Sequence, residues 1–540
     1  MISVREEATS PMFDPELFKR KADIRGIYPN QINEELAWFT GRYLVRSLKT
    51  LTDEKSPAIL VGRDGRTSSP AIYSAMLQGI AAEGGVPVGA GLATTDMIQW
   101  GVGEQLNGVI AGAMITASHN PPEYNGIKMV MRNRDNGGID ILRPLDQLHP
   151  QFEKDGNNAA APAAACAPFP AQARLDLQKE FTKAACDRST RLGSAKGKIV
   201  LDPGNGVGGL FVPLLKEALA ARGAEVEVLA VAEQIDGRFP TRPSNPGLPG
   251  AVKLLQETVI EQGAAFGAAF DGDADRVFLV DEWGQFVSGS LMLAALARNY
   301  VSAATSGDKS VVYAAVASWL VPQTVRAAGG TPIICRVGQD AAKVALVKTN
   351  AVFGGESSAH YNFPDKYCLD SGLFALIGFW DMLLASGKSC SELLSELKPW
   401  PNSGEVNLRF TCSDWQSVSR DVISAVRNEF STDDKNCYIL DLDGVSVLHP
   451  RSDKFATVDD VFQIDKEHDS EGLTYRVVQD YTPEWWFNIR ASNNEPLLRV
   501  NFESRESADV AAKTYALISR IRELCKGRAT VAVQDWGNLK

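Results

Sequence analysis

Three segments of the chain share one pattern of apolar and polar positions. Each opens with a β-branched apolar run, passes through a turn of small residues, and then keeps an apolar stripe at helical spacing for about four turns. A glycine follows each stripe, where a helix ends most easily in the left-handed conformation. The pattern predicts three β-α-β units with parallel strands and right-handed crossovers. The three segments begin at Ala58, Lys198 and Ser310.

The spacing of these segments, on the order of 100 residues, indicates three related α/β domains rather than a short-period solenoid. The C-terminal part carries no fourth copy of the pattern. Its strand-like runs, EVNLRF, TYRVVQD, WWFNIRAS and LLRVNFE, and one helical stretch near 506–525 predict an α+β domain. The Ala/Pro-rich segment 157–175 is typical of a linker. We therefore expect domains at 1–175, 176–295, 296–400 and 401–540.

Composition narrows the function classes. The 540 residues are 44% apolar and 22% charged, which is typical of a globular protein and excludes a largely disordered chain. The formal net charge of -11 argues against nucleic acid or an anionic membrane as the main partner. No apolar run approaches the ~20 residues of a membrane span, and the N-terminus lacks the apolar core of a signal peptide. We expect a cytoplasmic protein whose cysteines are free thiols.

A serine loop lies within 109–130, where an apolar run gives way to two consecutive prolines and then to a second strand-like run. The prolines exclude a helix, so Ser118 is expected at the tip of a loop at the carboxyl end of a strand. His119 and Lys128 stand close to it in the sequence. A hydroxyl that accepts and donates a phosphoryl group needs such cationic neighbours, because the phosphoryl group is negatively charged.

Three aspartates alternate along a second loop, at Asp271, Asp273 and Asp275, between two apolar strand-like runs. Carboxylates this close repel one another unless a cation neutralises them, and oxygen ligands favour a hard divalent ion, Mg2+ first. An EF-hand is disfavoured, because Arg276 stands where that loop needs glycine and a strand pattern follows. A solvated acidic turn and a phosphatase with Asp271 as its nucleophile remain alternatives.

A third segment, 353–360, places Glu356, Ser358 and His360 at alternate positions after a strand-like run. In an extended backbone these side chains point the same way. A carboxylate and a hydroxyl suit the binding of sugar hydroxyls, and an imidazole suits proton transfer. The alternative is a hydrophilic loop with a hydrogen-bonded histidine.

A fourth segment, 485–496, runs from a strand pattern into a polar turn. It offers an arginine, a hydroxyl and two side-chain amides, which together suit a phosphate-binding loop. The alternative is an ordinary turn with a solvated arginine. The residues concerned are Arg490, Ser492, Asn493 and Asn494.

Together with Asp23-Ile24-Arg25-Gly26 near the start, these segments resemble the α-D-phosphohexomutase family, in its phosphomannomutase/phosphoglucomutase branch. The likeness runs from about Lys21 to about Glu503 and keeps the order of the family's motifs. They are a first-domain signature, a phosphoserine loop, a metal loop, a sugar-specificity loop and a phosphate-binding loop, at Asp23–Gly26, Thr116–Pro121, Asp271–Arg276, Gly355–His360 and Arg490–Pro496.

The resemblance implies three mixed α/β domains and a C-terminal α+β domain around a central cleft. It implies an isomerase that moves a phosphoryl group reversibly between C1 and C6 of a hexose phosphate, mannose or glucose. Phosphorylated Ser118 would donate its group to give a hexose 1,6-bisphosphate, which turns around and returns the other phosphate. The implied cofactors are Mg2+ and the bisphosphate as activator. The implied partner is a phosphosugar, with no nucleic acid and no membrane, and no oligomeric state is predicted.

The resemblance also implies roles for single residues. Mg2+ would be held by four groups, Asp271, Asp273, Asp275 and an oxygen of phosphorylated Ser118. Catalysis would involve the residues around the phosphoserine and one near the reacting hydroxyl, namely Arg25, His119, Lys128 as acid/base group, and His360. The substrate would be bound by Arg276, Glu356, Ser358, Arg490, Ser492, Asn493 and Asn494.

The chain departs from the family pattern at several positions. An aromatic residue is common where Ala22 stands, a lysine near Val316, and a histidine at Gln339, while Asn494 replaces a threonine. The segment 452–480 reads as an insertion in the last domain. The departures at 316 and 339 motivate a further alternative, a phosphosugar-binding protein of the same fold that lacks turnover.

Overall fold

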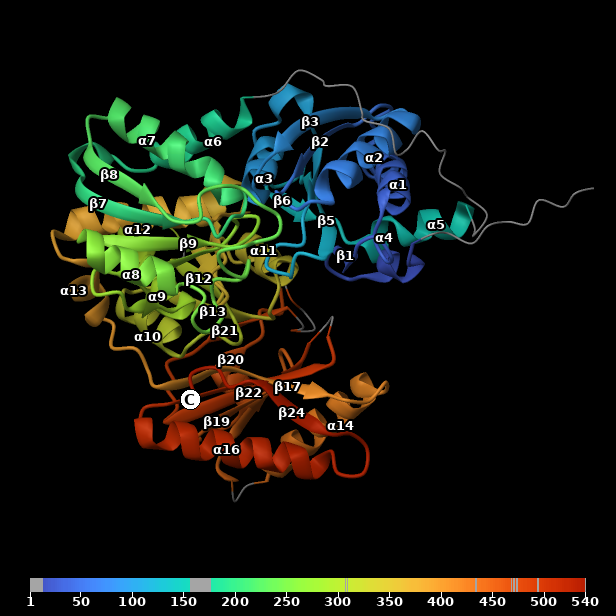
Figure 1. Cartoon of the computed structure of the whole chain (residues 1–540). Helices are drawn as coiled ribbons and strands as arrows, with labels where there is room; N and C mark the ends of the chain where they lie inside the picture. Colours follow the sequence, from blue (N-terminus) through green and yellow to red (C-terminus); the bar gives the residue numbers. More distant parts are fainter. Residues whose placement is uncertain are drawn as a thin grey trace, which may run out of the picture. The chain divides into compact units, whose positions relative to one another are not determined.

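The computed structural model describes residues 13–155, 176–305, 307, 309–432, 435–467, 469, 472, 474–492 and 495–539 (Figure 1). The predicted linker at 157–175 lies outside them. The described part forms two compact units, one made of Met1–Ser288 with Ser358–Leu393 and the other of Gly289–Ser357 with Leu394–Lys540. Across these described ranges no helix is both long enough and apolar enough to span a membrane. The described cysteines are free thiols.

The first sheet of the first unit has the order β1-β5-β4-β2-β3, with β6 beside β5. The first predicted repeat is confirmed, because β2, α2 and β3 follow one another and the two strands are parallel. Gly84 ends the helix with a φ of 78°. The strands are β1 (Ile24–Ile27), β2 (Ala58–Arg63), β3 (Val86–Leu92), β4 (Ala111–Ile115), β5 (Tyr124–Arg132) and β6 (Ile139–Ile141). The helices are α1 (Glu34–Thr52), α2 (Ser69–Ala82), α3 (Thr95–Gly103), α4 (Pro144–Gln147) and α5 (His149–Asp155).

The second sheet, also in the first unit, has the order β11-β10-β9-β7-β8. The second repeat is confirmed in β7, α7 and β8, while β9 and β10 form an antiparallel hairpin whose turn is the triple-aspartate loop. The strands are β7 (Lys196–Asp202), β8 (Glu225–Ala230), β9 (Phe266–Phe270), β10 (Val277–Asp281) and β11 (Phe286–Val287). The helices are α6 (Leu177–Cys186), α7 (Phe211–Ala221) and α8 (Lys253–Gln262).

The chain returns to the first unit after residue 357. The β15–β16 hairpin (Tyr361–Phe363 and Leu369–Asp370) leads into the apolar helix α12 (Gly372–Ser386). The ring of Phe374 in α12 stacks on Phe181 of α6, with centroids 5.4 Å apart. This packing fixes the hairpin, and with it His360, against the second sheet's domain.

The third sheet lies in the second unit, where its strands have the order β14-β12-β13-β21-β20. The third repeat is confirmed in β12, α10 and β13. β20 and β21 come from the segment that the sequence marks as an insertion, and β21 pairs antiparallel with β13. The strands are β12 (Ser310–Ala314), β13 (Thr331–Cys335), β14 (Phe353–Gly355), β20 (Phe462–Gln463) and β21 (Tyr475–Val478). The helices are α9 (Gly289–Ala303), α10 (Leu320–Ala327), α11 (Gln339–Lys348), α13 (Cys390–Ser395) and α15 (Val458–Val461).

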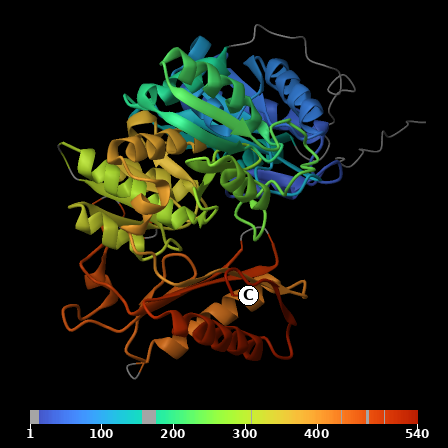
Figure 2. The ribbon, with the colours of Figure 1, turned by 60° about the vertical axis from the view of Figure 1, so that its left-hand side comes forward.

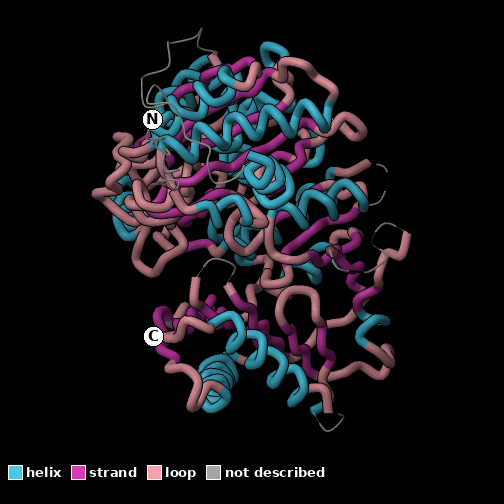
Figure 3. The backbone as a smooth tube through the Cα atoms, turned by 90° about the vertical axis from the view of Figure 1, so that its right-hand side faces the viewer, coloured by secondary structure: helices cyan, strands magenta, loops and turns pink. Residues whose placement is uncertain are grey.

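The fourth sheet is antiparallel, with the order β18-β19-β22-β23-β17-β24, and helices α14 (Trp415–Phe430) and α16 (Ser507–Leu524) cover one of its faces (Figures 2 and 3). The sequence predicts α16 but misses α14. Val418, Val422 and Val426 line the buried side of α14, and their β-branched side chains favour strands rather than helices. The strands are β17 (Asn402–Phe410), β18 (Tyr438–Leu440), β19 (Val445–His449), β22 (Trp485–Ala491), β23 (Leu497–Ser504) and β24 (Val531–Asp535).

The predicted fold class is confirmed: three mixed α/β sheets with a repeated β-α-β unit precede an α+β domain. The boundaries proposed at 175, 295 and 400 stay predictions.

Candidate active site

Ser118 lies in the loop just beyond β4 and is 1% exposed. Its φ of 50° is in the left-handed region, which is uncommon for a residue with a side chain and is found at functional sites. The Ser118 N–H donates to Thr116 Oγ1 at 2.8 Å, which stabilises this turn. The hydroxyl donates to Asp271 Oδ2 at 2.9 Å and lies 3.3 Å from His119 Nδ1. The structure therefore brings the serine loop and the triple-aspartate loop together.

Gly272 allows the two loops to approach so closely. A Cβ atom added at this position would lie 2.4 Å from the carbonyl oxygen of Ser118. No side chain larger than hydrogen fits there without moving a loop.

The three aspartates are almost completely buried between β9 and β10. Burial, reinforced by the charges of Asp275 and Asp273, raises the pKa of Asp271 to about 7. Burial also opposes the ionisation of Asp273, but the Lys128 ammonium outweighs it and lowers the pKa of Asp273 below its ordinary value. Burial and the neighbouring carboxylates therefore disfavour a charge on Asp271, whereas Lys128 favours the charged form of Asp273.

Lys128 on β5 is the cation nearest to this cluster. Its Nζ donates to Asp273 Oδ2 at 2.7 Å and to Asp275 Oδ2 at 2.6 Å. Although burial opposes it, the attraction of these two carboxylates raises the pKa of Lys128 above its ordinary value. Thr95, at the start of α3, also donates its hydroxyl to Asp273 Oδ2. Lys128 is therefore an ammonium in this site.

The aspartate loop fits a divalent metal ion. One oxygen of Asp273 and one of Asp275 are buried and have no hydrogen-bond partner in the described part of the chain. Ligand atoms of Asp271, Asp273 and Asp275 lie within 4.8 Å of one another. Because these donors are all carboxylate oxygens, the set suits Mg2+ better than a softer metal.

Arg25 and His119 complete the surroundings of Ser118. Arg25 Nη1 donates to Asn120 Oδ1 at 2.7 Å and Nη2 to Asp23 Oδ2 at 2.5 Å, while its buried Nε has no acceptor among the described residues. Burial, and then the nearby cations Arg276, Arg25 and Lys128, hold the pKa of His119 well below its ordinary value. His119 is therefore a neutral imidazole beside the hydroxyl.

His360 lies beside Arg276, the residue that follows Asp275 in the aspartate loop. Arg276 Nε donates to His360 Nε2 at 2.9 Å and lies 3.5 Å from Asp271 Oδ2. Because Nε2 accepts this hydrogen bond, we assign the proton of the neutral ring to Nδ1, which is 3.3 Å from Asp370 Oδ2. Asp370, the last residue of β16, places its carboxylate beside this nitrogen, a contact that the sequence does not reveal.

The sequence also misses Arg66, which is fully buried beneath the serine loop. Its Nε donates to Asp64 Oδ2 at 3.1 Å. In the sequence only the charged pair Asp64 and Arg66, directly after a buried strand, could have indicated this role. The carbonyl groups that Arg66 binds belong to another segment of the chain. The guanidinium donates to the carbonyl oxygens of Ser118 (2.9 Å), Asn120 (2.7 Å), Pro121 (2.6 Å) and Tyr124 (3.0 Å).

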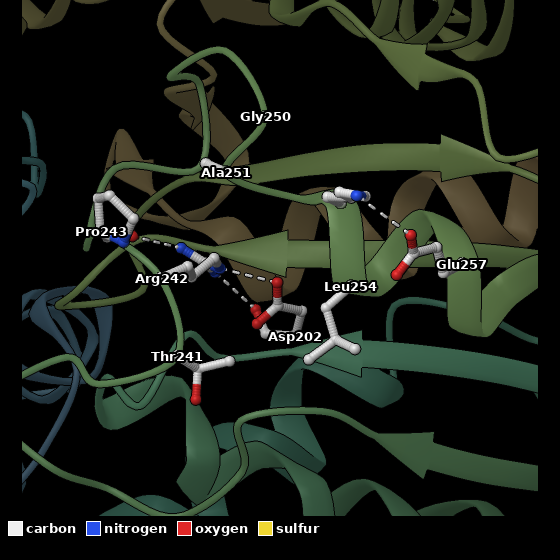
Figure 4. Close-up of a pocket in the computed structure, with 9 residues that line it drawn as sticks. Asp202, Thr241, Arg242, Pro243, Gly250, Ala251, Leu254 and Glu257 are labelled. Carbon is white, nitrogen blue, oxygen red and sulfur yellow. Dashed lines mark hydrogen bonds and ion pairs between the residues drawn. The ribbon is translucent and has the colours of Figure 1, made fainter.

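Arg242 binds the end of the strand that leads into the aspartate loop. Its Nε donates to Asp202 Oδ2 at 2.7 Å, and its Nη2 donates to the carbonyl oxygen of Phe270, the residue before Asp271, at 2.7 Å. Figure 4 shows this ion pair at the wall of a cavity of about 320 Å³ between the 241–251 loop and α8. The cavity is lined by Asp202, Thr241, Arg242, Pro243, Gly250, Ala251, Lys253, Leu254 and Glu257.

The predicted sugar loop is divided between the units. Glu356 directly follows β14 in the second unit, is buried, and accepts a hydrogen bond from Gln339 Nε2 at 2.9 Å. Ser358 and His360 belong to the first unit. Ser358 is half-buried.

The predicted phosphate loop begins at the end of β22 in the second unit. Arg490 is buried, and its Nη2 lies 3.2 Å from Glu405 Oε2, while its Nε has no partner among the described residues. The N–H of the buried Ser492 donates to the carbonyl oxygen of Leu497 at 2.9 Å. Asn493 and Asn494 lie outside the described residues.

Models of the phosphoglucomutase/phosphomannomutase domains match the chain in order: α/β/α domain I at 16–146, α/β/α domain II at 179–284, α/β/α domain III at 288–399 and the C-terminal domain at 447–518. A protein described as phosphohexose mutases, from Xanthomonas campestris pv. campestris, is 32% identical over 505 residues, which cover 93% of this chain and 98% of that protein. The chain belongs to the α-D-phosphohexomutase family.

Another relative of this phosphohexomutase is the phosphomannomutase of Escherichia coli K12, which is 30% identical over 510 residues and covers 93% of this chain and 98% of its own length. The crystal structure of a phosphoglucomutase/phosphomannomutase family protein from Burkholderia thailandensis superposes with a TM-score of 0.73 at 24% identity, and covers 96% of this chain and all of that one. The sequence relationship makes the chain a hexose-phosphate mutase, an isomerase of carbohydrate metabolism, and the structural likeness supports the fold.

Proposed function

We propose that this phosphohexomutase moves a phosphoryl group between C1 and C6 of a hexose phosphate, mannose or glucose, with Ser118 as the carrier and a hexose 1,6-bisphosphate as intermediate and activator. The observation that carries the proposal is the buried hydroxyl of Ser118, which is hydrogen-bonded to Asp271 beside carboxylate oxygens that have no hydrogen-bond partner among the described residues. A hydroxyl placed against an acidic metal loop suits phosphoryl transfer, in which positioning and charge neutralisation matter most.

Mg2+ would be held by Asp271, Asp273, Asp275 and an oxygen of phosphorylated Ser118. When bound, it supplies charge neutralisation at the transferring phosphoryl group. Arg25 Nε, a donor that lacks an acceptor in the described part of the chain, is available to a phosphoryl oxygen. His119 is neutral, and the protonated nitrogen of its ring can donate a hydrogen bond to a phosphoryl oxygen.

In the first transfer the Oγ–P bond of phosphorylated Ser118 breaks and a P–O bond to the sugar hydroxyl forms. The hydroxyl proton passes to His360 Nε2 once Arg276 turns its N–H towards the substrate, while Asp370 stabilises the imidazolium. Lys128, an ammonium in this site, gives a proton to Ser118 Oγ as it leaves. After the bisphosphate turns around, Ser118 Oγ forms a bond to the other phosphorus and the P–O bond to that sugar oxygen breaks. The Ser118 proton returns to Lys128, and His360 gives its proton to the sugar oxygen that leaves.

The remaining residues would hold the sugar and its second phosphate. We assign the ring hydroxyls to Glu356 and Ser358, and the non-reacting phosphate to the loop that begins at Arg490. Arg490 Nε has no acceptor among the residues that the structure describes, and this supports the assignment because a phosphate is a strong acceptor. The phosphate would be bound by Arg490, Ser492, Asn493 and Asn494.

A coupled assay with glucose 1-phosphate or mannose 1-phosphate, Mg2+ and the matching 1,6-bisphosphate tests the proposal. We expect turnover with at least one sugar, and a loss of about 10³-fold or more in Ser118→Ala. Ser194→Ala, at an exposed position, is the matched control and keeps activity. Full activity of Ser118→Ala would overturn the proposal, and release of inorganic phosphate by that variant would favour a phosphatase that uses Asp271.

A further inference from the structure

The first turn of α3 contacts two separate parts of the candidate active site. Thr95 donates its N–H to the carbonyl oxygen of Asp273 at 3.1 Å, and its hydroxyl donates to Asp273 Oδ2. The next residue, Asp96, accepts a hydrogen bond from the Ser371 hydroxyl at 2.5 Å, across 275 positions of the sequence. Thr95 therefore contacts the aspartate loop, whereas Asp96 contacts the segment that carries His360.

Asp96 uses its two carboxyl oxygens for two different elements. Oδ1 accepts hydrogen bonds from the Met97 N–H at 2.9 Å and from the Thr94 hydroxyl, both at the start of its own helix. Oδ2 accepts from Ser371, at the start of α12. An aspartate that only stabilised the N-terminus of α3 would need the first set of contacts alone. The contact with Ser371 therefore indicates a further role.

Ser371 connects Asp96 to the surroundings of His360. Its Oγ accepts the N–H of Phe374 at 3.1 Å and so caps α12, and its own N–H donates to the carbonyl oxygen of Tyr361 at 3.1 Å. Tyr361 directly follows His360 in the sequence, and Asp370 directly precedes Ser371. Asp370 Oδ2 lies 3.3 Å from His360 Nδ1. The position of Asp370 beside the imidazole therefore depends on where Ser371 is held.

The start of α12 also packs tightly against the aspartate loop. A Cβ atom added at Gly372 would lie 2.8 Å from the carbonyl oxygen of Ala274 and 2.9 Å from that of Arg276. Asp96 and Ser371 are completely buried, so water cannot replace the hydrogen bond between them. Loss of the Asp96 carboxyl group therefore changes the packing at the start of α12, directly beside Asp370.

The contact does not require a charge on Asp96. Burial raises the pKa of Asp96 to about 8, although the hydrogen bonds from Ser371 and Thr94 oppose this. At neutral pH most molecules therefore carry a protonated, uncharged carboxyl group at this position. Asparagine, which is uncharged and has the same shape, is then the closest substitute.

We propose that Asp96 is a positioning residue for the reaction: through Ser371 it fixes Asp370 beside His360 Nδ1 and so holds the imidazole in the orientation that proton transfer needs. The inference rests on the proposed function, which assigns this proton transfer to His360. Within the described part of the chain, Asp96 makes no hydrogen bond to a residue assigned to the sugar or its phosphates. Its loss should therefore lower kcat and leave KM nearly unchanged.

The test compares two substitutions of Asp96 in two backgrounds. Asp96→Leu keeps the branched shape of the side chain and removes its hydrogen bonds, whereas Asp96→Asn keeps an acceptor in the same place. We expect Asp96→Leu to lower kcat about 10- to 100-fold, and Asp96→Asn to restore most of this loss. In a His360→Ala background Asp96→Leu should cause no further loss, because no imidazole is left to position.

Asp281→Leu is the matched control. Asp281 is also buried and accepts hydrogen bonds from two backbone N–H groups, those of Trp283 and Gln285, but it lies at the end of β10 farther from the aspartate loop. Asp281→Leu should keep kcat, even where urea denaturation shows it to be as destabilised as Asp96→Leu. An equal loss for Asp96→Leu in the wild-type and His360→Ala backgrounds would overturn the inference, as would a loss confined to KM.

A second readout does not depend on turnover. In enzyme labelled with ¹⁵N-histidine, the ring nitrogen signals of His360, assigned by their absence in His360→Ala, report which nitrogen carries the proton. Asp96→Leu should shift these signals, and Asp281→Leu should not. Unchanged His360 signals in Asp96→Leu would overturn the inference. If no hexose phosphate turns over in the wild type, the proposed function fails, whereas this comparison still decides whether Asp96 positions His360.

Discussion

The Ser118 hydroxyl donates a hydrogen bond to Asp271 Oδ2 at 2.9 Å across 153 positions of the sequence. Ser118 follows β4 of the first sheet, and Asp271 follows β9 of the second, so the pair exists only when the two domains dock. Two more contacts join the same two domains: Ser244 Oγ donates to the carbonyl oxygen of Asn120 at 2.9 Å, and Thr95 N–H donates to that of Asp273 at 3.1 Å. The site is thus a property of the docked pair of domains.

Replacing Asp273 by Asn should weaken Mg2+ binding at least ~10-fold, because it removes one of three carboxylates whose oxygens face one another. Isothermal titration with MgCl2 after chelation measures the effect. Chelation should also abolish turnover, and added Mg2+ should restore it. Asp281→Asn, on the same hairpin but bonded to the N–H groups of Trp283 and Gln285, should bind Mg2+ like wild type. Equal affinity in Asp273→Asn and wild type would contradict the assignment.

Arg66→Met should lower the free energy of unfolding by about 3–5 kcal/mol, because it leaves Asp64 and the carbonyl groups of the serine loop buried without their donor. Urea denaturation followed by circular dichroism measures this change. Arg143→Met removes an exposed ion pair with Asp146 and should cost less than about 1 kcal/mol. Equal losses in the two variants would show that the buried guanidinium does not support the loop.

Arg242→Met should also be strongly destabilising, since Asp202 and the carbonyl group of Phe270 lose their buried donor. Asp202→Asn removes the carboxylate charge, so the double variant should be less destabilised than the sum of the single variants. A double-mutant cycle by urea denaturation gives this coupling. Arg242→Met should in addition weaken Mg2+ binding, because Phe270 precedes Asp271. Additive losses with unchanged Mg2+ affinity would contradict this supporting role.

The pairing of β21 with β13 should stabilise this part of the third sheet. It lies between β13 and β20, with Val477 opposite Ile333, so Val477→Pro removes a backbone donor from an interior strand. We expect faster amide hydrogen exchange in β13, measured by mass spectrometry. Val477→Thr, which keeps the backbone donor, is the control. Unchanged protection of the β13 amides from hydrogen exchange in Val477→Pro would mean that the pairing with β21 does not stabilise β13.

The sequence predicts those parts of the structure that local pattern determines. The glycines at 84, 223 and 329 have φ values of 78°, 78° and 83°, as their positions after helical stripes require. Contacts between distant segments are not encoded locally. In the sequence, Arg66 and Arg242 cannot be told from ordinary charged residues, because only the structure shows the carbonyl groups that they bind. The pairing of β21 with the third sheet could not be predicted from the sequence either, because a strand-like pattern does not indicate which strand it pairs with.

The most direct test of the phosphoserine proposal follows the phosphoryl group itself. The Mg2+-loaded enzyme is incubated with hexose 1,6-bisphosphate labelled with ³²P, and its tryptic peptides are sequenced by mass spectrometry before and after a chase with unlabelled hexose 1-phosphate. The account predicts label on Ser118 that passes to the sugar during the chase. Label on Asp271, or label on Ser118 that the chase does not remove, would contradict it.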